Sequence, residues 1–554
     1  MLDTITRQTD REEAIVSKTL RDFSVMSGDR STYNGHCEEI AELILPSHRN
    51  TFFHGAQNTP GEKRSDRQVD STGMLALSRF GAICDSLLTP RNLLWHGLQH
   101  PDPAIRKDRN ARLWYEEVTR ILFQMRYATN ANFAAQNQGT YQSLGAFGTG
   151  VMYIDKFYDI ANRVRGFRYK SLPLGEVYLG ANHQGLFDRF IRIMRPTALQ
   201  MTQVAEWKGR LPGQVKTALD KGASTKFTIL HYVYPRDDYD PDRLDAKGMP
   251  WVSHYVSVEG RMHLSEGGYR GFPIAASRYQ QAPGEDYGRS VAMDVLPSLK
   301  TLNAEKKVFL KQGHRAGDPV LLLQDDGLAS MSLKPGALNK GGWSADGKPL
   351  VGTLPTGDIQ VTYEMMQEEK NLIDDSFFVS LFRVMFENPQ MTATQVIEIV
   401  NEKGILIAPT IGRQSSEYIG PVVGRELDLG SDMGVFPPMP PILKEAGADY
   451  EVEYTSPLAK AMRAGEAAGF FRTADKFLEY SAQLGDASIM DGFNFEAAVP
   501  YISDIQQVPE SLMASPKEKA AKAEARRKAQ ETQDMIAAAP AAAAMEKNRM
   551  QGGA

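Results

Sequence analysis

Two long helical segments on either side of a turn-rich stretch are the feature that most constrains the fold of this 554-residue chain. Apolar residues recur at helical spacing from Ser290 to about Gln312, where Pro297 predicts a kink, and again over residues 363–386. The predicted buried positions are Val291, Val295, Leu299, Leu302 and Phe309 in the first segment and Met366, Ile373, Phe377, Leu381 and Met385 in the second. Because the residues between them have the Gly, Pro and Asp density of a small β-rich module, the pattern predicts a stalk of two helices with a tip.

In the part of the chain before this stalk, the spacing of apolar residues changes from helical to strand-like at about residue 150. Helical spacing predicts helices within residues 11–46, 71–88 and 111–128. In the helix of residues 71–88, the predicted buried face comprises Leu75, Leu77, Phe80, Ile83 and Leu87. From residue 150, short segments rich in β-branched and aromatic residues alternate with turns such as Asn182–Gly185, which predicts an antiparallel meander. The expected fold class is α+β, mainly helical.

Residues 385–404, MFENPQMTATQVIEIVNEKG, join an Asn-Pro-Gln loop to a helix with strong start signals. Thr392 and Gln395 form a capping box, and Met391 and Val396 occupy the hydrophobic-staple positions. Pro389 limits the backbone freedom of the loop. The sequence therefore predicts a short rigid projection that contains no nucleophile, general base or metal ligand.

Beyond that helix the chain alternates helix signals with helix breakers. Breaks are expected near Gly404, Pro409 and Gly420–Pro421, before a Pro-rich crossing and a strand in residues 450–457. Ser456 caps a further predicted helix. The tail is dominated by Ala, Lys, Glu and Arg, so a helix there is polar nearly all round. Such a helix is either solvated and frayed or stabilised by copies of itself.

The sequence contains no coherent catalytic or metal-binding motif. It has no GxxxxGK[ST], HExxH or HxH pattern. The glycines of GAFGTGVMYID precede a predicted strand, which indicates a tight turn, and DDYDPDRLDAKG lacks the glycine and closing Glu of a calcium loop, which indicates a solvated loop. Cys37 and Cys84 are too far apart for a CxxC pair, and His36 beside Cys37 falls on a predicted helix. We therefore expect a structural or binding protein rather than an enzyme, with no cofactor and no metal.

Hydropathy argues against a membrane or secreted protein, and net charge argues against a protein that binds nucleic acid tightly. No apolar run approaches the length of a membrane span, and the N-terminus lacks the apolar core of a secretion signal, so synthesis in the cytosol and no membrane partner are expected. The net charge of -5 means that the surface as a whole does not attract phosphate backbones. If nucleic acid is a partner, we do not expect it to be bound tightly through ionic contacts to its phosphates.

Five segments together resemble the portal, or head-to-tail connector, proteins of podovirus-type tailed bacteriophages. They are DSTGMLALSRFGAICDSLLTPRNLLWHGL, LGAFGTGVMYID, GEDYGRSVAMDVLPSLKTLN, ENPQMTATQVIEIVNEKG and YTSPLAKAMR. They recur in the order of the family from about residue 30 to 465. One segment alone would be a weak signal, whereas five in register are fairly specific.

The resemblance implies a ring of identical subunits, twelve in the assembled virion, at one vertex of the capsid. Double-stranded DNA would be driven in through its channel by terminase and would leave by it at ejection. The implied partners are terminase, then the tail adaptor, and capsid and scaffolding proteins, with assembly in the host cytoplasm. The implied parts are a wing (1–288), stem helices (289–315 and 361–384), a clip (316–360), a tunnel loop (385–391), a wing helix with a return strand (392–459) and a crown (460–554).

The resemblance also assigns candidate roles to individual residues. The candidates for DNA contact in the tunnel loop are Phe386, Glu387, Asn388, Pro389 and Gln390, and the loop anchors are Met391, Thr392, Gln395 and Val396. The candidates for the channel wall are Glu364, Glu368, Asp374 and Asp375. The candidates for partner binding in the clip are Pro319, Lys334, Trp343 and Lys348. An acidic wall offers DNA phosphates no strong binding sites along the channel, but an ordinary solvated helix face explains the acids equally well. For Trp343 the alternative is a core tryptophan in a small module.

Two alternative functions stay open at this point. One is another non-enzymatic virion component, such as a tail-tube or capsid-interior protein. The other is a metal-dependent DNA-processing enzyme that uses scattered carboxylates. Rings seen by electron microscopy would favour a portal, whereas nuclease or nucleotidase activity with magnesium or manganese would favour the enzyme.

Overall fold

The computed structural model describes most of the chain up to residue 455 and several shorter segments beyond it. The described residues are 2–53, 59–161, 163–243, 245–323, 331–340, 342–355, 357–383, 412–447, 449–455, 472–480, 503, 512–515 and 517–533. The chain divides into two compact units. The first contains Met1–His96, Ile121–Phe436 and Tyr454–Met462, and the second contains Gly97–Arg120, Pro437–Glu453 and Arg463–Ala554. The two larger sheets and both helices of the predicted stalk belong to the first unit.

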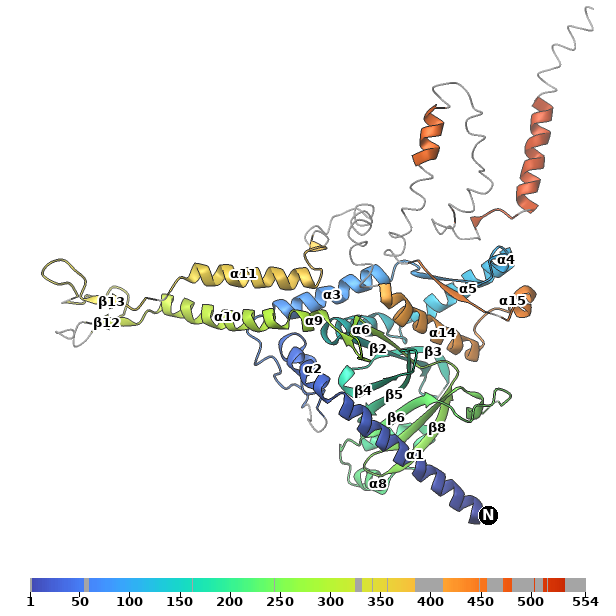
Figure 1. The fold of residues 1–554 in the computed structure, drawn as a ribbon, viewed down its shortest axis with the longest axis horizontal. Coiled ribbons are helices and arrows are strands. Elements are labelled where there is room, and N and C mark those ends of the chain that lie inside the picture. The colour runs from blue at the N-terminus through green and yellow to red at the C-terminus, as the bar shows by residue number, and fades with distance from the viewer. Residues whose placement is uncertain are drawn as a thin grey trace, which may run out of the picture. The chain divides into compact units, whose positions relative to one another are not determined.

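Helices precede the sheets along the chain, as predicted (Figure 1). They are α1 (Leu2–Asp29), α2 (Ser31–Leu43), α3 (Thr72–Leu88), α4 (Pro103–Arg106), α5 (Arg109–Arg126) and α6 (Phe133–Phe147), with a 3-10 turn at Pro46–His48. The predicted face of α3 is confirmed at Leu77, Phe80, Ile83 and Leu87, which are buried. It is wrong at Leu75, which is 49% exposed because it lies on the opposite side of the helix from Leu77.

The predicted antiparallel meander is confirmed as a five-stranded sheet in the order β4-β5-β6-β7-β8. Its strands are β4 (Val177–Ala181), β5 (Phe187–Met194), β6 (Ile229–Pro235), β7 (Trp251–Ser257) and β8 (Met262–Tyr269). Helices α7 (Ala198–Gln203) and α8 (Gly213–Asp220) contribute to a core around Trp207 and Ile229. A second core around Tyr178 and Leu230 is covered by Phe23 and Met26 of α1.

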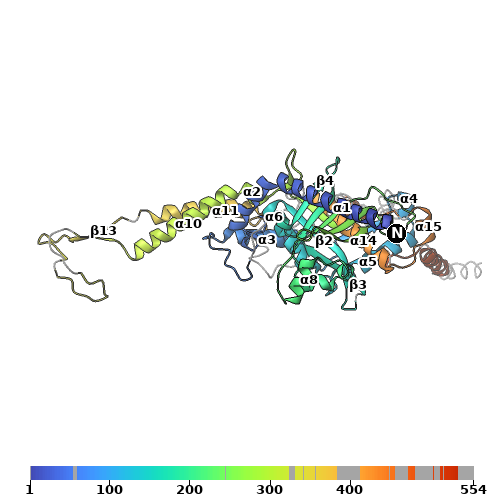
Figure 2. The same ribbon diagram turned by 90° about the horizontal axis from the view of Figure 1, so that it is seen from below.

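A three-stranded sheet, ordered β3-β2-β9, lies beside α6 (Figure 2). Its strands are β2 (Thr149–Tyr158), β3 (Val164–Ser171) and β9 (Ile274–Arg278). The predicted glycine turn into a strand is confirmed at Gly148, which ends α6 in a left-handed conformation with φ +74°. A Cβ there would lie 2.2 Å from the carbonyl oxygen of Gly288, so both conformation and space require glycine.

The remaining elements of the described chain are short, apart from the helices of the stalk, α14 and one C-terminal helix. The strands are β1 (His96–Gln99), β10 (Gln280–Gln281), β11 (Gly288–Arg289) and β14 (Glu451–Tyr454), and the helices are α9 (Val291–Asp294), α14 (Gly420–Met433) and α15 (Pro441–Glu445). Single turns of 3-10 helix lie at Leu174–Glu176, Ala205–Trp207 and Ala246–Gly248. In the tail, residues 517–533 are helical and exposed, as expected for a sequence that is polar nearly all round. The predicted strand after the Pro-rich crossing is confirmed as β14.

The helix break expected at Gly420–Pro421 is wrong. A π-helical turn at Ser415–Ile419 runs directly into α14, where Pro421 lies in the first turn. Proline has no N–H to donate to the preceding turn, and the wider winding accommodates its ring without ending the helix. Glu417 holds this turn to β9 by accepting hydrogen bonds from the Arg278 backbone N at 2.9 Å and from Arg278 Nη2 at 2.9 Å. The predicted breaks near Gly404 and Pro409 lie outside the described residues.

A fully buried ion pair connects α5 to α14. Arg126 Nε donates to Glu426 Oε1 at 2.8 Å, and both side chains have no exposed surface. Tyr169 of β3 donates its hydroxyl to the same carboxylate oxygen at 2.5 Å. The Arg126 guanidinium lies 4.2 Å from the ring centroid of Trp95 and 4.6 Å from that of Phe123. Both charges are therefore removed from water and depend on each other.

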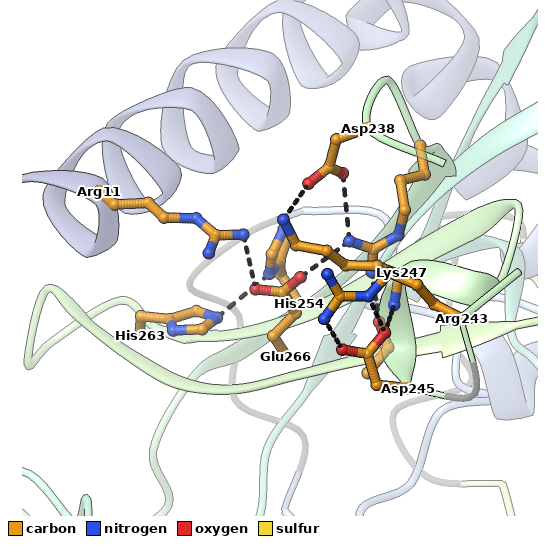
Figure 3. Close-up of polar contacts among 10 residues, drawn as sticks. Arg11, Asp238, Arg243, Asp245, Lys247, His254, His263 and Glu266 are labelled. Atoms are coloured by element: carbon orange, nitrogen blue, oxygen red, sulfur yellow. Dashed lines mark hydrogen bonds and ion pairs between the residues drawn. The ribbon is translucent and has the colours of Figure 1, made fainter. Parts of the chain in front are cut away.

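A network of charged residues from α1, β8 and the loop after β6 lies beside a buried histidine pair (Figure 3). His254 Nδ1 lies 3.1 Å from His263 Nε2, and both side chains are buried. Glu266 accepts from Arg11 of α1 at 3.2 Å, which ties the helix to β8. In the loop that was predicted to be solvated, Asp238 pairs with Lys247 at 3.0 Å. That prediction is confirmed, because the acids of the loop are exposed, although Asp238 also pairs with the buried Arg236 at 3.3 Å.

We expect the free energy of unfolding to fall as the pH drops from about 6.5 towards 4. Burial lowers the pKa of His254 to about 4 and also lowers the pKa of His263. In that window the unfolded chain binds protons that the folded chain does not, which destabilises the fold by up to about 1.4 kcal/mol per pH unit for each histidine. The Tm of the His254→Gln variant, measured between pH 7.5 and 5, is expected to change less steeply with pH than that of the natural chain.

The exposed His183 supplies the control for this measurement, because His183→Gln removes a histidine without touching the buried pair. This variant is expected to keep the pH dependence of the natural chain. Equal slopes for all three proteins would contradict the assignment of the pH dependence to the buried pair.

Candidate functional site

The predicted stalk is a pair of helices that lie side by side and antiparallel, with a hairpin at one end (Figures 1 and 2). They are α10 (Leu296–Gly317) and α11 (Ile359–Ser376). Thr362 donates its hydroxyl to Gln312 Oε1 at 3.0 Å, and the rings of Phe309 and Tyr363 lie 6.3 Å apart, so these residues fix the register of the two helices. The side chains buried at the base of the pair are Leu299, Leu302, Met366 and Ile373.

The start of the first helix agrees with the predicted kink. α9 ends at Asp294, Val295 separates it from α10, and Pro297 lies in the first turn of α10. Proline is tolerated there because the N–H of a first-turn residue has no intrahelical partner. α10 then continues to Gly317, beyond the predicted end at about Gln312.

The second helix is shorter than predicted. The expected segment extends to Phe386, whereas α11 ends at Ser376 and Phe378 adopts φ +62°. The helix ends in a Schellman motif, in which the backbone N of Val379 donates to the Asp374 carbonyl at 2.8 Å and that of Phe378 donates to the Asp375 carbonyl at 3.0 Å. Apolar spacing alone could not distinguish this turn from a further helical turn.

Polar contacts at the base of the pair were not predicted from the sequence. Asn303 Oδ1 of α10 accepts from the backbone N of Val69 at 2.7 Å, and its amide donates to the Arg67 carbonyl at 3.1 Å. Lys370 of α11 lies 3.9 Å from Asp70 in the same segment. These contacts attach the base of both helices to the segment before α3. No local motif marks them, because the partners are more than 200 residues apart.

The carboxylates proposed for the channel wall lie in different surroundings. Glu364, Glu368 and Asp375 are exposed along α11, and Glu364 accepts from Gln360 Nε2 at 2.8 Å. Asp374 instead pairs with Arg383 at 3.4 Å. Three of the four acids are therefore exposed on α11, whereas Asp374 is less exposed and forms an ion pair.

Two further carboxylates, Glu305 and Glu369, lie between the helices. Partial burial raises the pKa of Glu305, and the nearby Glu369 raises it further. One carboxylate oxygen of each residue is buried without a hydrogen-bond partner in the described structure. This pair weakens the contact between the helices relative to an apolar pair, because like charges repel.

The tip of the pair is a small two-stranded hairpin with little core. β12 (Leu321–Leu323) pairs with β13 (Val351–Thr353). Trp343 is 69% exposed, so the alternative of a core tryptophan is wrong. The other clip candidates are also at the surface: Lys334 and Lys348 are exposed and Pro319 is half-exposed. Leu333 and Leu338 are exposed by 70% and 95%, which gives the tip an apolar surface without a partner in the described chain.

The tunnel-loop candidates and their anchors lie outside the described residues. They are Phe386, Glu387, Asn388, Pro389, Gln390, Met391, Thr392, Gln395 and Val396.

Potential metal ligands and thiols lie within the described ranges. No cluster of three or more His, Cys, Asp or Glu side chains there is placed to hold a metal ion. Cys37 and Cys84 are buried free thiols, and burial raises the pKa of Cys37 to about 12. None of the described helices is both long and apolar enough to cross a membrane.

Comparison with known proteins fits this arrangement. The family model for bacteriophage head to tail connecting proteins matches residues 17–513. The chain belongs to this head-to-tail connector family. The connector is 28% identical over 453 residues to the probable portal protein of Bordetella phage BPP-1, which covers 79% of this chain and 78% of the relative. It is 25% identical over 508 residues to the portal protein of Salmonella phage epsilon15, with 90% and 88% covered. The resemblance to podovirus-type portals is confirmed.

Proposed function

We propose that copies of this connector assemble into a ring, of twelve subunits, around a channel for double-stranded DNA at one capsid vertex. The observation that carries the proposal is the antiparallel pair of α10 and α11, which bears an exposed apolar hairpin at one end and a row of carboxylates on α11. Such a pair gives a subunit both a wall and a docking tip. The names of the two relatives support the same assignment.

The wall is formed by α11 in this proposal. DNA phosphates held by Lys or Arg would add salt-sensitive contacts that must be broken at every step of translocation. α11 exposes Glu364, Glu368 and Asp375, whereas Lys370 lies beside Asp70. A phosphate that approaches α11 therefore meets no unpaired lysine or arginine on this helix. The loop from Phe386 to Gln390, anchored through Thr392 and Gln395, forms the constriction.

The tip is the clip, which docks terminase during packaging and the tail adaptor afterwards. Trp343, Leu333 and Leu338 offer a large exposed apolar area, and Lys334 and Lys348 lie within the same module. Tryptophan is among the residues that most often carry the binding energy of protein interfaces. Because the module has little core, most of its side chains are free to form one surface that binds terminase first and the tail adaptor afterwards.

Negative-stain electron microscopy of the purified protein tests this proposal. Rings with a central hole are expected, together with DNA binding that stays weak and is lost in moderate salt. A monomer at high concentration under several salt conditions would refute the ring. Hydrolysis of DNA or nucleotides with magnesium or manganese would instead support the enzyme alternative, which predicts no ring.

A further inference from the structure

The exposed charges of the stem pair, α10 and α11, are sorted by helix. α10 carries Lys300, Lys307 and Lys311, and α11 carries Glu364, Glu368 and Asp375. Lys300 pairs with Glu39, whereas the other five form no ion pair with the described residues of the same chain. One helix therefore presents a basic stripe and the other an acidic stripe.

Each stripe lies on one side of its helix. The three lysines are separated by seven and then four residues, and the three acids by four and then seven. These intervals keep side chains on one face of an α-helix. The residues at the contact between the helices, such as Phe309 and Met366, lie on the opposite faces. The stripes thus mark the two outer edges of the stem pair.

The reversed spacing places the charges level with one another. The helices are antiparallel, and the Thr362–Gln312 hydrogen bond and the Phe309–Tyr363 contact set their register. In this register, Lys311 lies at the level of Glu364 and Lys307 at the level of Glu368. Lys300 lies at the level of Asp375. All three basic positions match the three acidic positions without a shift along the stem.

An apolar stripe runs beside the acids. Val361, Met365 and Leu372 each precede one of the acids by three residues, and they are exposed by 52%, 50% and 46%. Three half-exposed apolar side chains in one row favour coverage by a neighbouring helix. This edge of α11 therefore has an apolar surface that a neighbouring helix can bury. Its acids favour a basic helix as that neighbour.

We propose that the basic edge of α10 in one copy docks against the acidic edge of α11 in the next copy. Three lysine–carboxylate pairs form at equal heights, so the operation relating the copies contains no translation along the stem. A head-to-tail contact without translation closes into a ring when its rotation divides the full turn, whereas one with translation gives a filament. Two-fold packing of like edges is disfavoured, because it would oppose lysine to lysine or acid to acid.

This inference rests on the proposed ring and adds the contact that closes it. Exposed ion pairs contribute little affinity individually, so their role here is to select direction and height. The pairing also engages the lysines of α10, so these cations are withheld from DNA phosphates. Lys300 exchanges its exposed partner Glu39 for Asp375 of the next copy.

Charge reversal followed by charge exchange tests the contact. The Lys307→Glu/Lys311→Glu variant is expected to lower the assembled fraction at least tenfold at low salt, and so is Glu364→Lys/Glu368→Lys. The variant with all four changes exchanges the two edges and is expected to recover assembly. Lys208→Glu/Lys216→Glu, on exposed positions of the first unit, changes the net charge as the first variant does and should assemble normally. Sedimentation velocity and native mass spectrometry measure the assembled fraction.

Two results would overturn the inference. One is normal assembly of both reversed variants, and the other is an exchanged variant as defective as either of them. Failure of the natural chain to form rings would overturn the proposed function instead, so the two failures are distinguishable.

Discussion

Replacing Glu426 with Gln is expected to lower the free energy of unfolding by about 3–5 kcal/mol. The substitution leaves the guanidinium of Arg126 buried among aromatic rings without a compensating charge. It also removes the charge that accepts the Tyr169 hydroxyl. Since this cluster joins α5, β3 and α14, its loss should destabilise the whole helical and sheet core of the first unit. Urea denaturation followed by tryptophan fluorescence measures the change, because Trp95 lies against Arg126.

The matched control removes both charges together. The Arg126→Met/Glu426→Leu variant is expected to be closer to the natural chain than Glu426→Gln, because no unpaired charge stays buried. Arg120→Met breaks an exposed pair with Glu117 elsewhere on α5 and should leave the denaturation midpoint nearly unchanged. An unaltered midpoint for Glu426→Gln would show that the pair is not essential to the core.

The elements that the sequence predicts well are those with one buried face. α3, α5 and the strands of the meander have a clear period, because one side meets the core and the other meets water. α6 was missed for the opposite reason. It is buried on most sides, and several of its buried residues, such as Asn137, Thr140 and Ser143, are polar. A helix of this kind has no strong hydrophobic period to find.

The features that the sequence could not predict depend on contacts between distant residues. Arg126 and Glu426 are 300 positions apart, and each alone resembles a surface charge. α11 ends at a left-handed cap that is formed by Phe378, where neither glycine nor asparagine marks the end in the sequence. The three lysines and three acids of the stem are visible in the sequence, but their match requires the antiparallel register of α10 and α11. Local sequence patterns were sufficient to predict most helices and strands. The ends of the helices and the match of charges between them depend on tertiary structure.

Replacing residues 318–358 with a short Gly-Ser linker is expected to preserve rings and abolish DNA packaging. The linker joins Gly317 to Ile359, the adjacent ends of two antiparallel helices. In the described structure β12 and β13 pair only with each other, so their removal leaves the rest of the core intact. The deletion does remove the exposed apolar side chains that we propose for terminase docking. Ring formation is measured by electron microscopy and packaging by protection of DNA from nuclease.

The Trp343→Ser variant separates loss of a docking surface from loss of a spacer. Trp343 is 69% exposed, so its replacement should preserve rings and the hairpin while it weakens terminase binding. Normal packaging by the linker variant would refute the clip assignment. Loss of rings in the linker variant would assign the segment to contacts between copies, as expected for a tube-forming protein. Because the tip is exposed and the stem edges carry the matched charges, we expect assembly to depend on the stem and docking to depend on the tip.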